Sequence, residues 1–146
     1  MNSLGNLQAA LATASSRSFG MVFENDQKFW MASLKPTLKA AQVVPDNIPV
    51  EVKELDVALL HTVVLRDILG ISAEAQEKKL NLDYVKVADE AVAAVREGKA
   101  QLSFILNATQ LDEIRSAARA GHVMPQKSTY FYPKLLSGLV FNLMAE

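Results

Sequence analysis

The sequence predicts an α+β fold, a two-layer sandwich in which helices pack on a mixed β-sheet. Three observations support this class. Two β-prone runs flank a short group of turn-forming residues near the N-terminus, strand and helix patterns alternate in the second half, and no segment repeats at a fixed period. The expected order is an N-terminal hairpin, then an αβαβα series, then a C-terminal strand.

The chain length fits a single domain. The chain has 146 residues, of which 50% are hydrophobic and 21% charged, the balance of an ordinary globular protein. We expect residues 1–17 to form a helical or flexible N-terminal segment and residues 18–146 a single α+β domain. Within the first segment, Leu4, Leu7 and Leu11 have the three- and four-residue spacing of a short amphipathic helix.

The first strands are predicted by residue type. Phe19–Phe23 and Lys28–Leu34 flank the turn-formers Glu24–Gln27, which predicts a β-hairpin. The following stretch, Lys35–Lys53, should contain no long regular element because prolines interrupt it at Pro36, Pro45 and Pro49.

A long buried helix should follow. Asp56–Leu69 is apolar around most of the helical circumference, and Gly70 is placed to end it. Asp56 is best explained as the N-cap of this helix or as a partner of its dipole.

The second half alternates strands with helices. The predicted elements are a strand at Leu82–Val87, a helix at Glu90–Glu97 capped by Asp89 and ended by Gly98, a strand at Gln101–Leu106, and a helix that opens at a capping box, Thr109–Asp112, and closes at Gly121. Such alternation implies at least one parallel strand pair. The apolar strand at 101–106 is expected in the middle of the sheet.

Composition excludes several classes of function. The formal charge of −1 provides no field for binding nucleic acid or an anionic membrane surface. The absence of cysteine excludes disulfides and thiolate chemistry, and two histidines with scattered carboxylates predict no metal site. We find neither a secretory signal nor an apolar run of about 20 residues, so a cytoplasmic location without membrane contact is expected.

The segment Met124–Lys134 concentrates cations, hydroxyls and aromatics between two prolines. Lysine charges with hydroxyl donors are the groups that bind an anion. The proposed ligand-binding residues are Lys127, Ser128, Thr129, Tyr130 and Lys134. The alternative is that Tyr130–Tyr132 forms an ordinary packed strand that Pro133 ends.

Two histidines are secondary candidates for a site. His61 lies among apolar residues of the predicted long helix, where a neutral structural imidazole is the commoner role. His122 follows Gly121 and can instead interact with the C-terminal dipole of the preceding helix.

The run Gly121–Leu135 with Ser137–Val140 resembles the C-terminal signature of a prokaryotic family known as domain of unknown function number 1015. Two shorter blocks, Leu55–His61 and Phe104–Asn107, resemble other parts of that family. Gln126 stands where the signature usually has proline.

The resemblance implies that the chain is the C-terminal part of a longer protein. Members of the family carry an upstream Asp-Gly-His-His-Arg stretch similar to ParB and sulfiredoxin-like nucleotide-binding folds, and this stretch does not occur here. The implied partner is therefore a missing N-terminal domain, and a nucleotide would bind in the full-length parent. No cofactor is expected in this chain itself.

These observations support one functional reading and leave two alternatives. The first is a non-catalytic C-terminal domain that contributes its Lys/Ser/Thr/Tyr segment to a shared anion- or nucleotide-binding cleft. The second is part of a phosphoryl-transfer enzyme, a ParB-like small-molecule kinase. The third is a structural module that forms a homo-oligomer through Phe29, Trp30 and the strand Tyr130–Tyr132.

Overall fold

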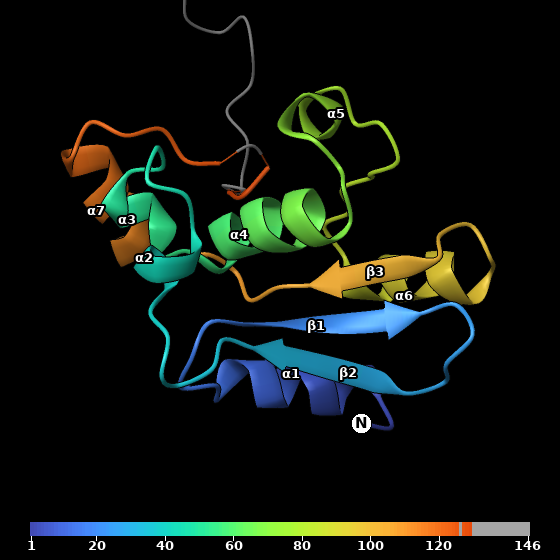
Figure 1. Ribbon diagram of the computed structural model, residues 1–146. Coiled ribbons are helices and arrows are strands. Elements are labelled where there is room, and N and C mark those ends of the chain that lie inside the picture. The colour runs from blue at the N-terminus through green and yellow to red at the C-terminus, as the bar shows by residue number, and fades with distance from the viewer. Residues whose placement is uncertain (126, 130–146) are drawn as a thin grey trace, which may run out of the picture.

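The computed structural model describes residues 1–125 and 127–129 and confirms the α+β class. Its strands are β1 (Ser18–Phe23), β2 (Phe29–Ser33) and β3 (Leu102–Ile105) (Figure 1). Its helices are α1 (Leu4–Ala12), α2 (Ala40–Val43), α3 (Val50–Lys53), α4 (Asp56–Leu59), the π-helix η1 (Leu60–Ile68), α5 (Ala73–Glu77), α6 (Ala88–Arg96) and α7 (Leu111–Arg119).

The predicted hairpin is confirmed. β1 and β2 pair antiparallel in a register that sets Val22 opposite Phe29. Asp26 organises the turn, since its carboxylate accepts hydrogen bonds from the Lys28 amide at 2.8 Å and from Trp30 Nε1 at 2.7 Å. The hairpin therefore forms for the local reasons that the sequence indicated.

The order of strands differs from the expectation. β3 pairs antiparallel with β1, so the order of the described strands is β2-β1-β3, and β1 rather than β3 is the middle one. The expected parallel pair is absent from the described strands. Leu82–Val87 forms no strand. Val85 and Val87 favour strands by residue type, but both are about half exposed outside the sheet. The predicted C-terminal strand lies outside the described residues.

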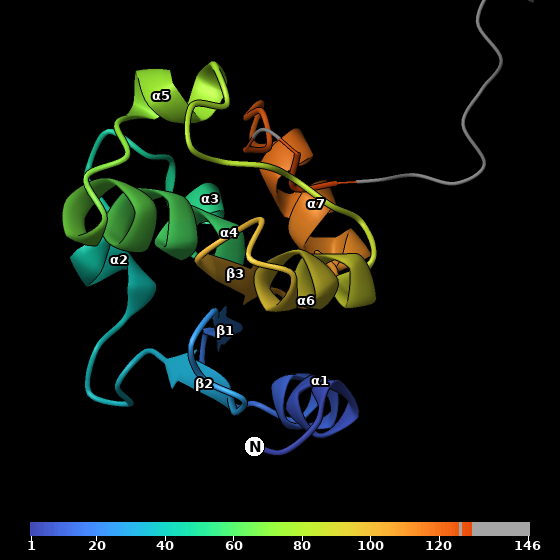
Figure 2. The ribbon, with the colours of Figure 1, turned by 90° about the vertical axis from the view of Figure 1, so that its right-hand side faces the viewer.

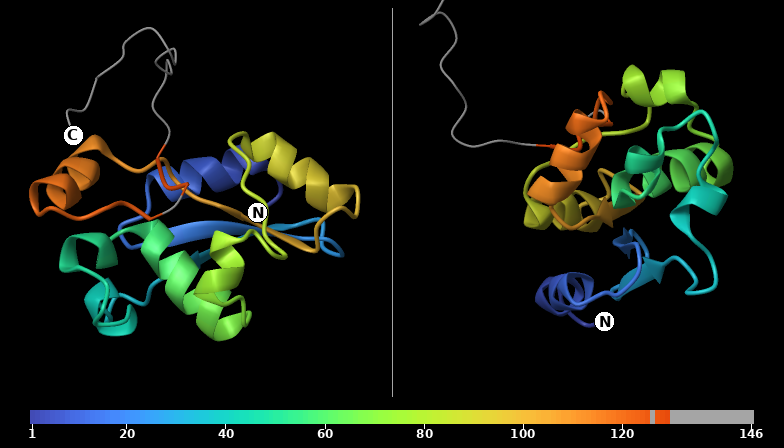
Figure 3. Two further views of the ribbon diagram at one scale, coloured as in Figure 1. Left: turned by 90° about the horizontal axis from the view of Figure 1, so that it is seen from above. Right: turned by 90° about the vertical axis from the view of Figure 1, so that its left-hand side faces the viewer.

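Helices cover both faces of the sheet, which gives three layers where two were expected. α1 and α6 lie on one face, and α4 with η1 on the other (Figures 2 and 3). The buried residues between the sheet and the first pair of helices are Leu7, Leu11, Val22, Phe29, Val95 and Ile105. Those on the second face are Phe19, Val44, Leu59, Leu60 and Leu65.

The helix α1 is part of this core. Leu7 is fully buried and Leu11 is 2% exposed. Leu7 lies so close to β1 that a Cβ added at Gly20 would be 2.5 Å from its Cδ2 atom. Ser3 caps the helix by accepting a hydrogen bond from the Asn6 amide. A glycine at position 20 thus allows helix and strand to approach.

The predicted helix from Asp56 to Leu69 is present, but most of it is π-helical. Its first half is buried, whereas Ile68 near its end is 69% exposed, so the expectation of burial throughout is wrong. The buried Gln76 side chain donates hydrogen bonds to the His61 and Ile71 carbonyls, which gives both backbone oxygens a partner. Gly70, at a φ of 72°, follows the helix as predicted.

The other predicted boundaries are partly correct. The stretch between Lys35 and Lys53 contains only the one-turn helices α2 and α3, as its prolines indicated. α6 begins after Val87 rather than at Asp89, and α7 has Gln110 as its N-cap, one residue beyond the predicted Thr109. The closing residues Gly98 and Gly121 both have positive φ angles, as a helix C-terminus requires.

We expect Leu7→Ala to lower the free energy of unfolding by about 2–5 kcal/mol, because it leaves a cavity between α1 and the sheet. The matched control is Leu111→Ala on α7, where the side chain is 60% exposed and the loss should be below about 0.5 kcal/mol. Urea unfolding followed by circular dichroism measures both changes. Equal small losses would show that α1 does not contribute to the core.

Candidate functional site

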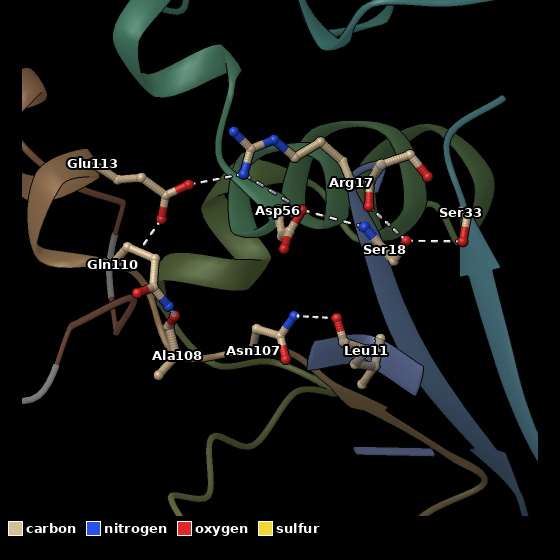
Figure 4. Close-up of polar contacts among 10 residues, drawn as sticks. Leu11, Arg17, Ser18, Ser33, Asp56, Asn107, Ala108, Gln110 and Glu113 are labelled. Atoms are coloured by element: carbon tan, nitrogen blue, oxygen red, sulfur yellow. Dashed lines mark hydrogen bonds and ion pairs between the residues drawn. The ribbon is translucent and has the colours of Figure 1, made fainter. Parts of the chain in front are cut away.

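A polar cleft lies where the ends of four elements meet (Figure 4). The loop after α1, the loop after β3, the start of α4 and the start of α7 enclose a cavity of about 260 Å³. The residues that line it are Ala14, Ser15, Ser16, Arg17, Asp56, Asn107, Ala108, Gln110 and Glu113. Segments far apart in the sequence therefore build this cleft.

Arg17 connects the two carboxylates of the cleft. Its Nη1 atom lies 2.8 Å from Glu113 Oε1 and 4.0 Å from Asp56 Oδ1. The three side chains are only partly exposed, at 33% for Arg17, 25% for Glu113 and 19% for Asp56. The guanidinium thus pairs closely with Glu113 and only loosely with Asp56.

Asp56 is the most buried charged group of the cleft. Its Oδ1 atom accepts a hydrogen bond of 3.3 Å from the Ser18 amide at the start of β1. Burial raises the pKa of this carboxyl above its ordinary value of 3.8, while Arg17 and the Ser18 amide act in the opposite direction and Glu113 adds to the rise. Leu55 is the N-cap of α4 and Asp56 its first residue, so the N-cap alternative is wrong, whereas a carboxylate in the first turn agrees with the dipole alternative.

The opposite wall is formed by the loop between β3 and α7. The Asn107 side-chain amide donates to the Leu11 carbonyl at 2.9 Å, which attaches this loop to α1. Gln110 donates its backbone amide to Glu113 Oε2 at 2.9 Å and its side-chain amide to the Ala108 carbonyl at 3.0 Å. The wall is held in place by its own polar groups.

The described part of the predicted anion-binding segment forms a turn beside this loop. Ser128 donates its hydroxyl and its amide to the Pro125 carbonyl at 2.6 and 3.2 Å, and its own carbonyl accepts a 2.9 Å hydrogen bond from the Thr109 hydroxyl. Lys127 is exposed, has a φ of 60° and forms no ion pair within the described residues. Thr129 is half-buried, and Tyr130 and Lys134 lie outside the described residues.

His61 lies apart from this segment, on η1. Its ring faces Tyr84 with 6.1 Å between centroids. Burial lowers the pKa of His61 below 6.5 and raises that of Tyr84 above 10.0. The buried Tyr84 hydroxyl has no hydrogen-bond partner within the described chain. Because His61 belongs to η1 and Tyr84 lies between α5 and α6, this contact joins η1 to the segment before α6.

His122 connects two helices. Its Nε2 atom lies 3.3 Å from Glu51 Oε2 of α3, and its backbone amide donates to the Ala117 carbonyl of α7 at 2.9 Å. The structure therefore gives each predicted histidine a different neighbour, Tyr84 for one and Glu51 for the other.

The aromatic pair of the hairpin is divided between the interior and the surface. Phe29 is 8% exposed and lies against the guanidinium of Arg96, whereas Trp30 is 47% exposed. A self-association surface on this hairpin would therefore include Trp30 and exclude Phe29.

None of the protein-family models, curated proteins or solved structures compared with the chain matches it. The resemblance to domain of unknown function number 1015 stays a prediction. Within the described residues, no group of three or more histidines and carboxylates is placed to hold a metal ion. In the same part of the chain, no helix combines the length and the apolar character needed to cross a membrane.

Sequence reasoning missed Arg17 and Glu113 as members of a site. Arg17 is the only cation among the described residues that line the cleft, yet it is 96 positions from Glu113. A signal was present in Glu113, since a carboxylate three residues after a helix N-cap is the second half of a capping box. A capping box predicts where α7 begins, but it does not predict that Glu113 lines a cleft.

Asp56 should make stability depend on pH in a specific direction. Because its pKa is raised on folding, the folded protein binds this proton more readily, so its ionised form destabilises the fold above the ordinary pKa. Relative to Asp56→Asn, the wild type should gain stability as pH falls from neutral through the raised pKa of Asp56. Urea unfolding at several pH values measures this difference.

Asp46→Asn serves as the control of opposite sign. The hydrogen bond from Lys53 lowers the pKa of Asp46, so the wild type should lose stability relative to this variant as pH falls through that lowered pKa. A loss of the same sign for Asp56 would mean that Arg17 outweighs burial in the cleft.

Proposed function

We propose that the chain is a binding domain without catalytic machinery of its own, which contributes the segment from Lys127 to Lys134 to an anion- or nucleotide-binding cleft shared with another domain. The observation that carries this proposal is the turn at Lys127. An exposed lysine, unpaired within the described residues, stands on a turn that side-chain and backbone hydrogen bonds hold in place.

The backbone of Lys127 supports a role beyond packing. A φ of 60° is unfavourable for a residue with a Cβ and is often found where the surrounding structure holds a residue in place for function. Here the Ser128 and Thr109 hydrogen bonds supply that support. The charged residue is thus positioned in advance, which reduces the entropy lost when it binds a phosphate-like anion.

The turn is too exposed to form a complete site. Lys127 does not line the polar cleft, and the Ser128 hydroxyl is already donated to a backbone carbonyl. An anion held only by an exposed lysine gains little in water, since solvent screens the charge. A second surface that covers Lys127 would supply both further donors and exclusion of water. This is the reason for a shared rather than a self-contained site.

We expect Lys127→Gln to weaken the binding of ATP to this chain by at most about fivefold, because an exposed charge pair contributes only about 0.2–1 kcal/mol. The matched control is Lys79→Gln, which removes an exposed lysine that also has a positive φ, 53°. Affinities are measured by NMR titration at low ionic strength. An equal loss in both variants would mean non-specific attraction, and unchanged binding in Lys127→Gln would remove the segment from the site.

A further inference from the structure

The carboxylate of Asp56 has too few partners for its degree of burial. Its side chain is 19% exposed, yet its closest donor is the Ser18 amide at 3.3 Å, and its nearest cation is the Arg17 guanidinium at 4.0 Å. Arg17 is engaged more closely by Glu113, at 2.8 Å. A buried carboxylate normally has strong charge-assisted hydrogen bonds. Asp56 therefore retains capacity to bind a donor.

The charges that line the cleft do not balance. Among the described residues that line the cleft, Arg17 is the only basic one, whereas Asp56 and Glu113 are both acidic. With all three ionised, these described residues carry one excess negative charge. Asp56 is the least exposed of the three side chains, at 19%, so solvent screens its charge less than that of Arg17 or Glu113.

The hydrogen-bonding capacity that remains in the cleft is that of acceptors. The side-chain amide groups of Asn107 and Gln110 already donate, to the Leu11 and Ala108 carbonyls. Asp56 Oδ2 and the amide oxygen of Asn107 accept no hydrogen bond from the described residues, whereas the Gln110 side chain takes part in the capping box with Glu113. Asp56 and Asn107 line the same cavity (Figure 4).

We propose that this cleft binds a small cation of the ammonium or guanidinium class, whose N–H groups donate to Asp56 and to the amide oxygen of Asn107. The excess negative charge of the cleft and its free hydrogen-bond acceptors both favour a positively charged ligand with N–H donors. An anion is repelled by the excess carboxylate, and a neutral polar molecule leaves the charge of Asp56 uncompensated. The cavity of about 260 Å³ has room for a small molecule or for a single side chain of a partner.

A cation beside Asp56 also opposes the effect of burial on this carboxyl. Burial raises the pKa of Asp56, and a bound positive charge favours its ionised form. The ligand and the ionised carboxylate thus stabilise each other. This proposal is independent of the anion site at Lys127, since no residue is shared and the charge of the ligand is opposite.

The test is an NMR titration of the full chain with methylguanidinium and, in a second series, with ethylammonium. The reporter is the backbone amide of Ser18, because it donates to Asp56 Oδ1. We expect saturable shifts at Ser18 with at least one of the two cations. Methylurea, the neutral isostere of methylguanidinium, should leave the Ser18 signal in place. No saturable shift with either cation, or equal shifts with methylurea, would overturn the proposal.

Variants then assign the binding to the cleft. Asp56→Asn should weaken binding about tenfold or more, because it removes the charge and keeps the shape. The matched control Asp89→Asn removes an exposed aspartate from the first turn of α6 and should have no effect. Glu113→Gln provides a second charge removal should Asp56→Asn not fold, and it should also weaken binding. Unchanged affinity in the folded cleft variant contradicts the site.

Discussion

The fold depends on how the buried start of β1 is satisfied. Ser18 is 2% exposed, so its amide cannot hydrogen-bond to water and needs an acceptor within the protein. Asp56 at the start of α4 provides it, while the Ser18 hydroxyl bonds to the Ser16 carbonyl and the Ser33 hydroxyl at 2.8 Å each. Because β1 is the central strand of the described sheet, these contacts position β2 and α4 relative to the rest of the molecule.

This requirement places a charged group in an unfavourable environment. An acceptor for one amide could be neutral, but the residue that accepts here is a carboxylate, and burial raises its pKa. Arg17 compensates only in part, since it also holds Glu113 of α7. The structural role and the proposed binding role of Asp56 thus have one origin, a hydrogen-bond acceptor whose negative charge the protein neutralises only in part.

Much of the fold could be predicted from local sequence signals, but the pairing of segments far apart in the sequence could not. The hairpin, the helix that begins at Asp56 and the helix-ending glycines follow from residues within a few positions of one another. The position of β3 beside β1 depends on residues far away in the sequence, and so does the absence of Leu82–Val87 from the described sheet. The cleft belongs to the second kind, since Arg17 meets Glu113 across 96 positions. Asp56 was accordingly assigned a role within its own helix.

One loop joins the two proposed binding regions. Asn107, Ala108 and Gln110 line the cleft, and Thr109 between them anchors the turn of Lys127 through its hydrogen bond to the Ser128 carbonyl. A displacement of this loop changes the cavity and the position of the lysine together. Binding at one place that shifts the loop therefore changes affinity at the other, and by thermodynamic linkage the change is the same in both directions. A ligand that ordered the loop would lower the entropy lost at the second site and would therefore favour binding there.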